Sequence, residues 1–117
     1  MNLQLQDKVV IVTGGAKGIG KGIVEVLAKE GAIPVIVGRS ATDNQLVVDE
    51  IEAAGGKAWQ VSAELSMPEE CEKAVKAVIE KFGRIEGLIN NAGVNDGVGL
   101  ETGDYKRFME SLHRNVV

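Results

Sequence analysis

The sequence has little cysteine and few aromatic residues. Cys71 is its single cysteine, which excludes an internal disulfide and a cysteine cluster for zinc. His113 is the single histidine and has no second ligand in helical register, so no metal site is expected. Phe, Trp and Tyr make up 3% of the 117 residues. A folded core must therefore consist of Val, Ile, Leu and Ala.

The chain also lacks an excess of basic residues and a long hydrophobic run. Its net charge is −4 and its pI is near 5.0, which argues against nucleic acid as the main partner, because phosphate-backbone binding needs a basic face. No apolar run approaches the roughly 18 residues of a membrane span, and the N-terminus has no apolar signal core. We therefore expect no membrane partner and a cytoplasmic location.

A glycine-rich turn stands between a strand pattern and a helix pattern. Residues 9–12 are Val-Val-Ile-Val, and residues 13–20 then read TGGAKGIG. A buried strand that breaks into such a turn and opens a helix can seat a pyrophosphate. The glycines allow a sharp turn and close approach, and the helix N-terminus offers free N–H groups and a partial positive charge.

Strand and helix patterns alternate along the whole chain. Strands are expected at 8–13, 33–37, 58–62 and 85–90, and helices at 19–30, 43–54 and 66–82, with a last helix opening at Asp104. This βαβαβαβα order with short links implies a parallel sheet with right-handed crossovers. The predicted fold class is α/β, a Rossmann-type doubly wound parallel sheet of strand order 3-2-1-4, in one domain spanning residues 1–117.

Residue spacing also predicts the helix caps and the buried helix faces. Asp43 is expected to cap the second helix, and Ser66 the third in a capping box with Glu69, while Gly31 and Gly83 end helices. The expected inward residues of the three helices, in chain order, are Ile19, Ile23, Val26 and Leu27; Leu46, Val47 and Ile51; and Cys71, Val75, Val78 and Phe82.

The sequence stops at Val116-Val117 inside an apolar helical pattern that has no stop signal. In the order 3-2-1-4, the fourth strand would be an open apolar edge, which natural domains usually cover. We therefore expect the chain to be truncated before later strands, and to associate or aggregate through this edge when isolated.

These motifs resemble the short-chain dehydrogenase/reductase family. The family's cofactor turn, Thr-Gly-x-x-x-Gly-x-Gly, is matched at Thr13–Gly20, and its Asn-Asn-Ala-Gly motif at Asn90–Gly93. Asn115 stands at the distance of a family Asn on the helix that follows. The resemblance covers the whole chain and only the N-terminal half of the family. Residues 90–100 and the start QDKVVIVTGGA also resemble its sugar dehydrogenases, of the L-fucose type.

The resemblance implies an oxidoreductase that moves hydride between a nicotinamide and a secondary alcohol or carbonyl. The family's catalytic Ser, Tyr and Lys lie in its second half, and the Tyr and Lys are four residues apart. Here the single tyrosine, Tyr105, has Met109 four residues on. Of the catalytic set only Asn115 is then present, where the family uses it to hold a water; an Asn on a helix surface is the alternative. This chain alone is expected to be inactive.

Lys17 and Arg39 indicate NADP(H) rather than NAD(H). An NAD-preferring site has an acid at the end of the second strand, but that position is Gly38, and Arg39 follows it. A guanidinium matches phosphate oxygens, and Lys17 supplies a second cation from the turn. The pair resembles the family's NADP pattern, although two solvated surface charges are the alternative. The hydroxyls of Ser40 and Thr42 could add contacts to the same phosphate.

The other cofactor residues follow from the turn and the strand ends. Glu64 stands where the family has an Asp that bonds the adenine, although a solvated loop carboxylate is an equal alternative. The hydroxyl of Thr13 is expected to hold the turn to the neighbouring strand, and the Asn-Asn-Ala-Gly segment has a partly structural role in the family. The full set of expected cofactor residues is Thr13, Gly14, Lys17, Gly18, Ile19, Gly20, Arg39, Ser40, Glu64, Leu65, Asn91, Ala92 and Gly93.

Two other interpretations stay open. The chain could be a nucleotide-binding module or fragment without catalysis. It could also be an extended-type Rossmann sugar-nucleotide enzyme, which the Asn-Asn-Ala-Gly motif and the Thr13 turn fit less well. For the parent enzyme, the resemblance implies a small-molecule alcohol or carbonyl substrate and a homo-oligomer.

Overall fold

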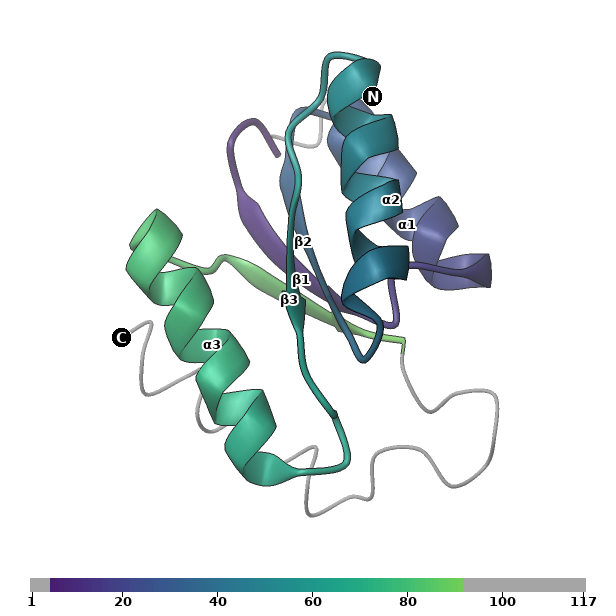
Figure 1. Cartoon of the computed structure of the whole chain (residues 1–117). Coiled ribbons are helices and arrows are strands. Elements are labelled where there is room, and N and C mark those ends of the chain that lie inside the picture. The colour runs from purple at the N-terminus through teal and green to yellow at the C-terminus, as the bar shows by residue number, and fades with distance from the viewer. Residues whose placement is uncertain (1–4, 92–117) are drawn as a thin grey trace.

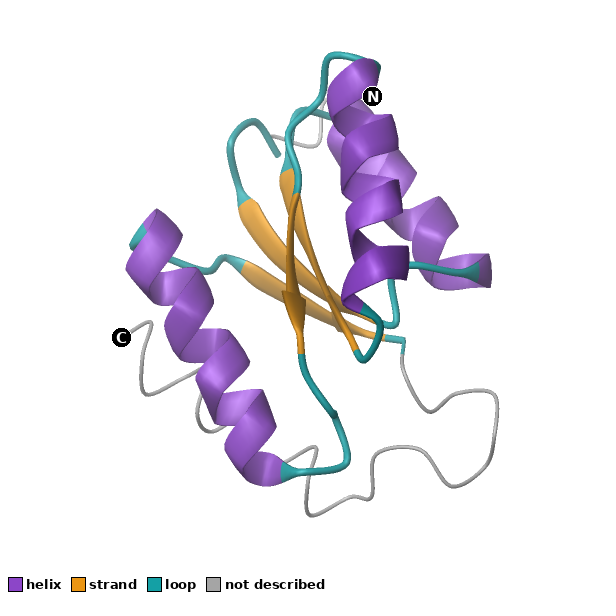
Figure 2. Ribbon diagram, in the orientation of Figure 1, coloured by secondary structure: helices purple, strands orange, loops and turns teal. Residues whose placement is uncertain are grey.

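The computed structural model describes residues 5–91 as a layered α/β unit (Figures 1 and 2). Its elements follow one another as β1 (Val9–Thr13), α1 (Gly18–Lys29), β2 (Ile33–Gly38), α2 (Ala41–Ala53), β3 (Trp59–Ser62), α3 (Pro68–Phe82) and β4 (Gly87–Asn90). The predicted alternation of strands and helices is confirmed in this range. The helix expected from Asp104 lies outside the described residues.

The four strands form one parallel sheet in the order β3-β2-β1-β4, which confirms the predicted fold class. Thr13 at the end of β1 is level with Val37 on one side and with Asn90 on the other. On β2, Gly38 is level with Ser62 of β3. The carboxyl ends of all four strands therefore meet along one edge of the sheet, where open α/β sheets bind their ligands.

Helices cover both faces of the sheet, with α1 and α2 on one face and α3 on the other (Figure 1). Successive strand side chains point to opposite faces. Two separate aliphatic clusters therefore flank the sheet. Val9, Ile11, Val35 and Val37 pack with α3 residues, whereas Val10, Val12 and Ile36 pack with Val24 of α1 and with Val47, Val48 and Ile51 of α2.

The buried face of α1 differs from the predicted one. Ile19 is 71% exposed and Val26 57% exposed, whereas Gly20 and Val24 are buried. The glycines explain the difference, because Gly15 and Gly20 let the start of the helix approach the strands closely. The face that carries Gly20 and Val24 therefore turns inward, and two of the four expected residues turn outward.

The start of α2 and one of its predicted inward residues also need correction. Ser40, not Asp43, is the N-cap, and its hydroxyl oxygen accepts a hydrogen bond from the Asp43 backbone N–H at 3.1 Å. The helix thus starts two residues before the expected position. Leu46 is 57% exposed because it lies outside the face of α2 that packs on the sheet. Val47 and Ile51 are buried as predicted, together with Val48 and Asn44.

The third helix has the predicted face but not the predicted cap. Cys71, Val75 and Val78 are buried, and Phe82 is partly buried at the helix end, edge to face with Trp59. Met67 holds the N-cap position without a side-chain cap bond. Ser66 is not the cap, because its hydroxyl donates to Glu64. Gly83 ends the helix in the left-handed conformation (φ 79°), as predicted.

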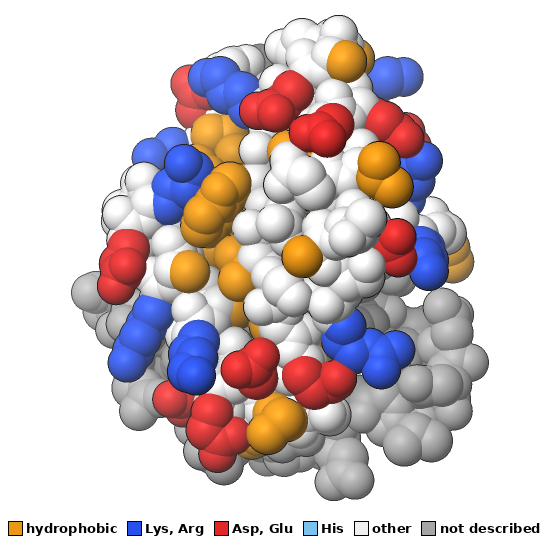
Figure 3. Space-filling model, in the orientation of Figure 1, with side chains coloured by type: hydrophobic (Ala, Val, Ile, Leu, Met, Phe, Trp, Pro, Cys, Tyr) orange, Lys and Arg blue, Asp and Glu red, His pale blue; other side chains and the backbone are white. Residues whose placement is uncertain are grey.

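The described surface is mixed in charge. Figure 3 shows acidic and basic side chains interspersed over one face, with a strip of hydrophobic side chains beside α3. None of the helices described in residues 5–91 has the length and apolar character needed to cross a membrane.

Candidate functional site

The turn after β1 lies at the carboxyl edge of the sheet and is held in a conformation that favours glycine. The Gly14 N–H donates to the Val37 carbonyl at 3.0 Å, which fixes the turn to β2. Gly14 and Gly18 have φ of 67° and 55°, a region that L side chains rarely adopt. A Cβ on Gly18 would have no heavy atom of residues 5–91 within 4 Å. The space beside Gly18 is therefore open to a ligand.

Two other glycines bring the helix close to the sheet. A Cβ on Gly20 would clash with the Gly14 carbonyl oxygen and lie 2.7 Å from the Asn91 side-chain nitrogen. A Cβ on Gly15 would lie 2.9 Å from a methyl group of Val24. The glycines of this stretch thus have separate tasks, since Gly14 and Gly18 shape the turn and Gly15 and Gly20 allow close packing.

Helix α1 has no acidic residue of its own in its first turn and no side-chain cap. Lys17 holds its N-cap position. By contrast, α2 has both a Ser40 cap and Asp43 in its first turn. The first N–H groups of a helix have no partner within the helix and carry partial positive charge. The start of α1 can therefore receive an external anion.

Residues at the end of β4 brace the turn. The Thr13 hydroxyl donates to Asn90 Oδ1 at 2.8 Å and accepts a bond from the Asn91 backbone N–H at 2.9 Å. The Asn91 side-chain nitrogen in turn donates to the Gly14 carbonyl at 3.3 Å. This confirms that the Thr13 hydroxyl holds the turn to the neighbouring strand. Asn90 and Asn91 likewise have a structural role, as expected for part of the Asn-Asn-Ala-Gly segment.

A cavity of about 240 Å³ opens beside this turn, and we call it the loop cavity. It combines backbone from the turn with polar side chains from the end of β2 and the start of α2. Its lining residues are Gly14, Ala16, Lys17, Gly38, Arg39, Ser40, Asp43 and Asn44. The structure thus brings Lys17, Arg39 and Ser40 together at one cavity, as the sequence predicted for a phosphate-binding corner.

Both cations of the loop cavity face a carboxylate. Lys17 Nζ lies 3.3 Å from Asp43 Oδ2, and Arg39 Nη1 lies 3.9 Å from Glu64 Oε2. Lys17 and Arg39 remain 82% and 79% exposed. These are exposed ion pairs, which contribute little to folding stability and can exchange partners easily.

Asn44 is a site residue that sequence reasoning missed. It is buried, and its side-chain nitrogen donates to the Gly38 carbonyl at 3.1 Å and to Gln60 Oε1 at 3.2 Å. It therefore fixes the end of β2 where the loop cavity opens. The sequence could have indicated this role. Asn44 lies on the same helix face as Val47, Val48 and Ile51, and a polar side chain buried there needs a hydrogen-bond partner.

Glu64 and Leu65 follow β3 at the same edge. Glu64 accepts a hydrogen bond from the Ser66 hydroxyl at 3.1 Å and faces Arg39. Leu65 is buried in the cluster under α3, so only its backbone is available to a ligand. Ile19 is exposed at the start of α1, next to the turn. Ala92, Gly93 and Asn115 lie outside the described residues.

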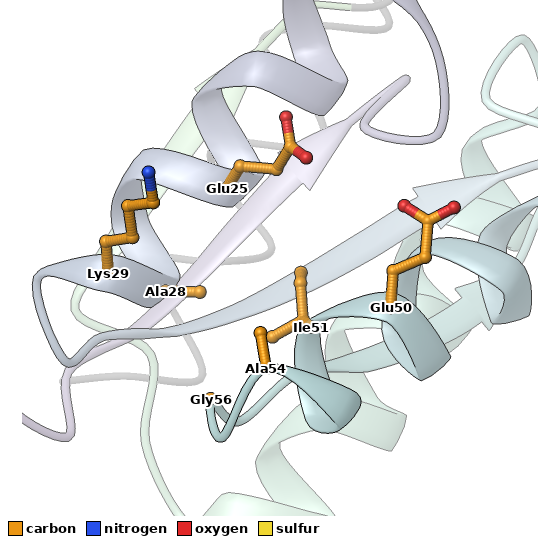
Figure 4. Close-up of a pocket in the computed structure, with 7 residues that line it drawn as sticks. All are labelled: Glu25, Ala28, Lys29, Glu50, Ile51, Ala54 and Gly56. Atoms are coloured by element: carbon orange, nitrogen blue, oxygen red, sulfur yellow. The ribbon is translucent and has the colours of Figure 1, made fainter.

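A second cavity, of about 150 Å³, lies between α1 and α2 and is shown in Figure 4. Ala28, Ile51 and Ala54 give it an apolar floor, and Glu25 and Glu50 stand at its rim with Lys29. We call it the helix groove. Its rim carries more acid than base, so it is less suited to phosphate than the loop cavity.

At the other end of the strands, where their amino ends lie, one carboxyl group has a lowered pKa. A hydrogen bond from Lys57 holds the pKa of Asp7 below its usual value, and the positive charge of Lys57 acts in the same direction. Asp7 and Lys57 precede β1 and β3, at the amino ends of the strands. Within residues 5–91, no group of three or more His, Cys, Asp or Glu side chains could hold a metal ion.

Comparison with known proteins agrees with this geometry. The family model described as short chain dehydrogenase matches residues 8–117. An uncharacterized oxidoreductase of Methylorubrum extorquens is 37% identical over 115 residues, which are 97% of this chain and 46% of that protein. A hydroxynaphthalene reductase of Aspergillus fumigatus is 36% identical over 114 residues, covering 97% of this chain and 42% of that protein.

Among solved structures, L-sorbose reductase from Gluconobacter frateurii, complexed with NADPH and L-sorbose, superposes with a TM-score of 0.88 at 26% identity. That match covers 98% of this chain and 49% of the other. A NADH-dependent reductase complexed with NAD superposes with a TM-score of 0.73 at 30% identity, over 98% and 50% of the two chains.

The chain thus spans about half the length of the proteins it matches. The family match extends over nearly all of its sequence, and the sheet order, the glycine turn and the Asn-Asn brace agree with it. The chain belongs to the short-chain dehydrogenase/reductase family.

Proposed function

We propose that this chain forms the cofactor-binding part of an oxidoreductase that transfers hydride between NADP(H) and a secondary alcohol or carbonyl. One observation carries the proposal. Within residues 5–91, the turn at residues 14–17 leaves open space beside Gly18, and α1 starts without a side-chain cap or an acidic residue in its first turn, next to the loop cavity. A dinucleotide needs such a place for its pyrophosphate.

The described residues fit the phosphate and adenosine parts of the cofactor. Backbone N–H groups at the start of α1 would hold the pyrophosphate, and the open space at Gly18 supports this assignment. Glu64 and the backbone of Leu65 are proposed for the adenine. For Asn91 we propose contact with the adenosine ribose, and for Ala92 and Gly93 close approach to the cofactor, in line with the resemblance.

The preference for NADP(H) rests on charge at the end of β2. The strand ends at Gly38, so no carboxylate stands there to bind a ribose 2′-hydroxyl or to repel a 2′-phosphate. Lys17, Arg39 and Ser40 line the same cavity. Charge-assisted hydrogen bonds from such cations are each worth about 1.5–3 kcal/mol. We therefore propose that the 2′-phosphate lies in the loop cavity.

The bound nicotinamide would supply the hydride chemistry. The residues of this chain bind and orient it. The hydrogen bonds of Thr13, Asn90 and Asn91 hold the turn against β4 through the protein's own groups. A preorganised turn lowers the entropic cost of binding. We propose that Asn115 is the chain's one member of the catalytic set, and that turnover needs the Ser, Tyr and Lys that the family places further on.

The cofactor assignment is tested by titrating the purified chain with NADPH and NADH and following nicotinamide fluorescence. We expect Arg39→Ala to weaken NADPH binding about tenfold and to leave NADH binding within twofold. Lys76→Ala is the matched control, because it removes one positive charge from an exposed position on α3. An unchanged preference for NADPH over NADH in Arg39→Ala would remove Arg39 from the site.

For the parent enzyme we propose a small-molecule substrate, a sugar in the first instance, a cytoplasmic location and a homo-oligomer. The sugar assignment is supported by the resemblance of residues 90–100 to sugar dehydrogenases and by the similarity to an L-sorbose reductase. Turnover of a panel of sugars and other secondary alcohols with NADP by the gene product that carries a Tyr-x-x-x-Lys would test it.

The alternative function is nucleotide binding without catalysis. Within residues 1–117, Tyr105 is the single tyrosine and Met109 stands four residues after it, so this stretch has no Tyr-x-x-x-Lys. The two functions make different predictions for the gene beyond codon 117. A reading frame that continues to a Tyr-x-x-x-Lys supports the enzyme, whereas an in-frame stop supports the module.

A further inference from the structure

We propose that Asp43 is a specificity-determining residue of the loop cavity, because its carboxylate competes with the cofactor 2′-phosphate for Lys17. Asp43 thereby limits the preference of the site for NADP(H) over NAD(H). The inference rests on the proposed function, namely that residues 13–20 and the loop cavity receive a nicotinamide dinucleotide.

Two elements place this carboxylate opposite the lysine. Lys17 belongs to the turn after β1, and Asp43 to the first turn of α2. Both line the loop cavity, where Lys17 Nζ and Asp43 Oδ2 lie 3.3 Å apart. An anion that uses Lys17 must therefore share it with Asp43 or displace it.

Asp43 is the less exposed partner of the pair and belongs to a helix. Its backbone N–H donates to the Ser40 cap at 3.1 Å, and its side chain is 38% exposed. A carboxylate in the first turn of a helix is also stabilised by the helix dipole. The Lys17 side chain is 82% exposed on a flexible stem. The longer Lys17 side chain can turn toward a bound anion, whereas the short Asp43 side chain on α2 lines the cavity.

Among the described residues, each cation of the loop cavity faces one carboxylate. Lys17 faces Asp43, and Arg39 faces Glu64 at 3.9 Å. A phosphomonoester carries a charge of about −1.5 to −2 at pH 7, so a 2′-phosphate has to compete with both carboxylates for the cations. A ribose 2′-hydroxyl brings no charge and meets no such competition. The carboxylates therefore weaken NADP(H) binding relative to NAD(H) binding.

Of the two carboxylates, Asp43 competes more strongly than Glu64 with a bound 2′-phosphate. The Lys17–Asp43 pair is shorter than the Arg39–Glu64 pair. Glu64 also accepts a hydrogen bond from the Ser66 hydroxyl, which directs it toward the β3–α3 loop. Asp43 lines the cavity itself, whereas Glu64 is absent from its lining. The competition is consequently assigned to Asp43.

The test measures how much the 2′-phosphate alone contributes to binding. Calorimetric titration of the purified chain with adenosine 2′,5′-bisphosphate and with 5′-AMP compares two ligands that differ only in this group. We expect Asp43→Asn to bind the bisphosphate about threefold to tenfold more tightly than the unmodified chain. The affinity for 5′-AMP should change by less than twofold.

Matched variants separate this effect from net charge and from folding. Asp49→Asn makes the same charge change on the same helix, at an exposed position that accepts a bond from Gln45, and is expected to leave both affinities within twofold. Asp43→Glu retains the carboxylate and should keep the affinity ratio of the unmodified chain. Asp43→Ser is a second neutral variant, tolerated in a first helix turn, should Asp43→Asn fold poorly.

A double-mutant cycle tests the competition for Lys17. In a Lys17→Gln background, the gain from Asp43→Asn should fall below twofold, because the cation that Asp43 occupies is gone. A full gain in that background, or an unchanged ratio in Asp43→Asn and Asp43→Ser, would overturn the inference while leaving the proposed function intact. Failure of the unmodified chain to bind either nucleotide would overturn both.

Discussion

At the residue scale, the shape of the site depends on the positions where only glycine fits. Gly20 and Gly22 lie two residues apart in α1, and their surroundings differ completely. A Cβ on Gly20 meets the Gly14 carbonyl and the Asn91 side chain, whereas a Cβ on Gly22 meets no heavy atom of the described residues within 4 Å. The first glycine is thus needed for the contact between turn, helix and β4, and the second is not.

We expect Gly20→Ala to lower the free energy of unfolding by about 1–3 kcal/mol, because backbone atoms must move to admit the methyl group. It should also weaken nucleotide binding. The same change at Gly22 should stabilise the chain by about 0.5–1 kcal/mol, since alanine is the better helix residue. Urea unfolding measures both. Equal effects of the two substitutions would contradict the packing described for Gly20.

Asp7 gives a pH-dependent prediction. Its folded pKa lies below the usual 3.8 because Lys57 donates a hydrogen bond to its carboxylate at 3.1 Å. A depressed carboxyl pKa contributes stability above the unfolded pKa, and this contribution is lost as the pH falls through the folded pKa. In Lys57→Gln the pKa of Asp7 should rise toward 3.8, whereas Lys76→Gln should not change it. Carboxyl NMR titration at low salt measures the shift, and an unmoved Asp7 pKa would exclude Lys57 as its cause.

Part of this residue-scale picture could be predicted from the sequence. The hydroxyl of Thr13 was expected to hold the turn, and it does so through Asn90 and Asn91. The partners of Lys17 and Arg39 could not be predicted, because Asp43 and Glu64 are 26 and 25 residues away along the chain. Pairing over such distances depends on the approach of α2 and β3 to the turn, which local patterns do not encode.

At the scale of the elements, the helix starts decide which side chains reach the loop cavity. Ser40 begins α2 with a true cap, so Asp43 falls in the first turn and faces Lys17. Met67 begins α3 without a side-chain cap bond, and Ser66 bonds to Glu64 instead. The two serines therefore differ in role although both precede a helix.

Ser40→Ala should destabilise the chain by about 1 kcal/mol through loss of the cap bond to the Asp43 N–H. Ser66→Ala removes only an exposed side-chain bond, so its cost should stay within about 0.5 kcal/mol. Thermal unfolding of both variants makes the comparison. A larger loss for Ser66→Ala would show that the capping box expected from the sequence operates after all.

The order and type of the elements were predictable, but helix rotation was less so. Hydrophobic spacing predicted the inward face of α3, where apolar residues recur regularly. In α1 the same reasoning placed Ile19 and Val26 inward, and both are exposed. Hydrophobic spacing takes account only of large apolar side chains, whereas this helix packs on the sheet through Gly20, which has no side chain. The error thus falls where close backbone approach replaces side-chain packing.

At the scale of the whole molecule, the described sheet ends in β4 at one edge. Among the described strands, β4 pairs only with β1, and its residues Leu88 and Ile89 are half-buried. Edge strands with apolar side chains favour pairing with other chains. This supports the expectation that the isolated chain associates.

Light scattering should then give a mass above the 12.4 kDa of one chain, increasing with concentration. Replacing Leu88 by Lys places a charge on β4 and should lower the apparent mass, whereas Leu46→Lys, at an exposed position on α2, should not. Leu88 also packs against the cluster under α3, so circular dichroism must show that the variant is folded before the masses are compared. A monodisperse monomer of the unmodified chain would refute association through β4.

The central claim is that a nicotinamide dinucleotide binds at the turn of residues 13–20 and in the loop cavity. The most direct test is an NMR titration of the ¹⁵N-labelled chain with NADPH. The account predicts that backbone amide signals of residues 14–20 and 38–44 shift in a saturable way, while those of Glu25, Ala28, Ile51 and Ala54 in the helix groove do not. Shifts confined to the helix groove, or none at saturating NADPH, would contradict it.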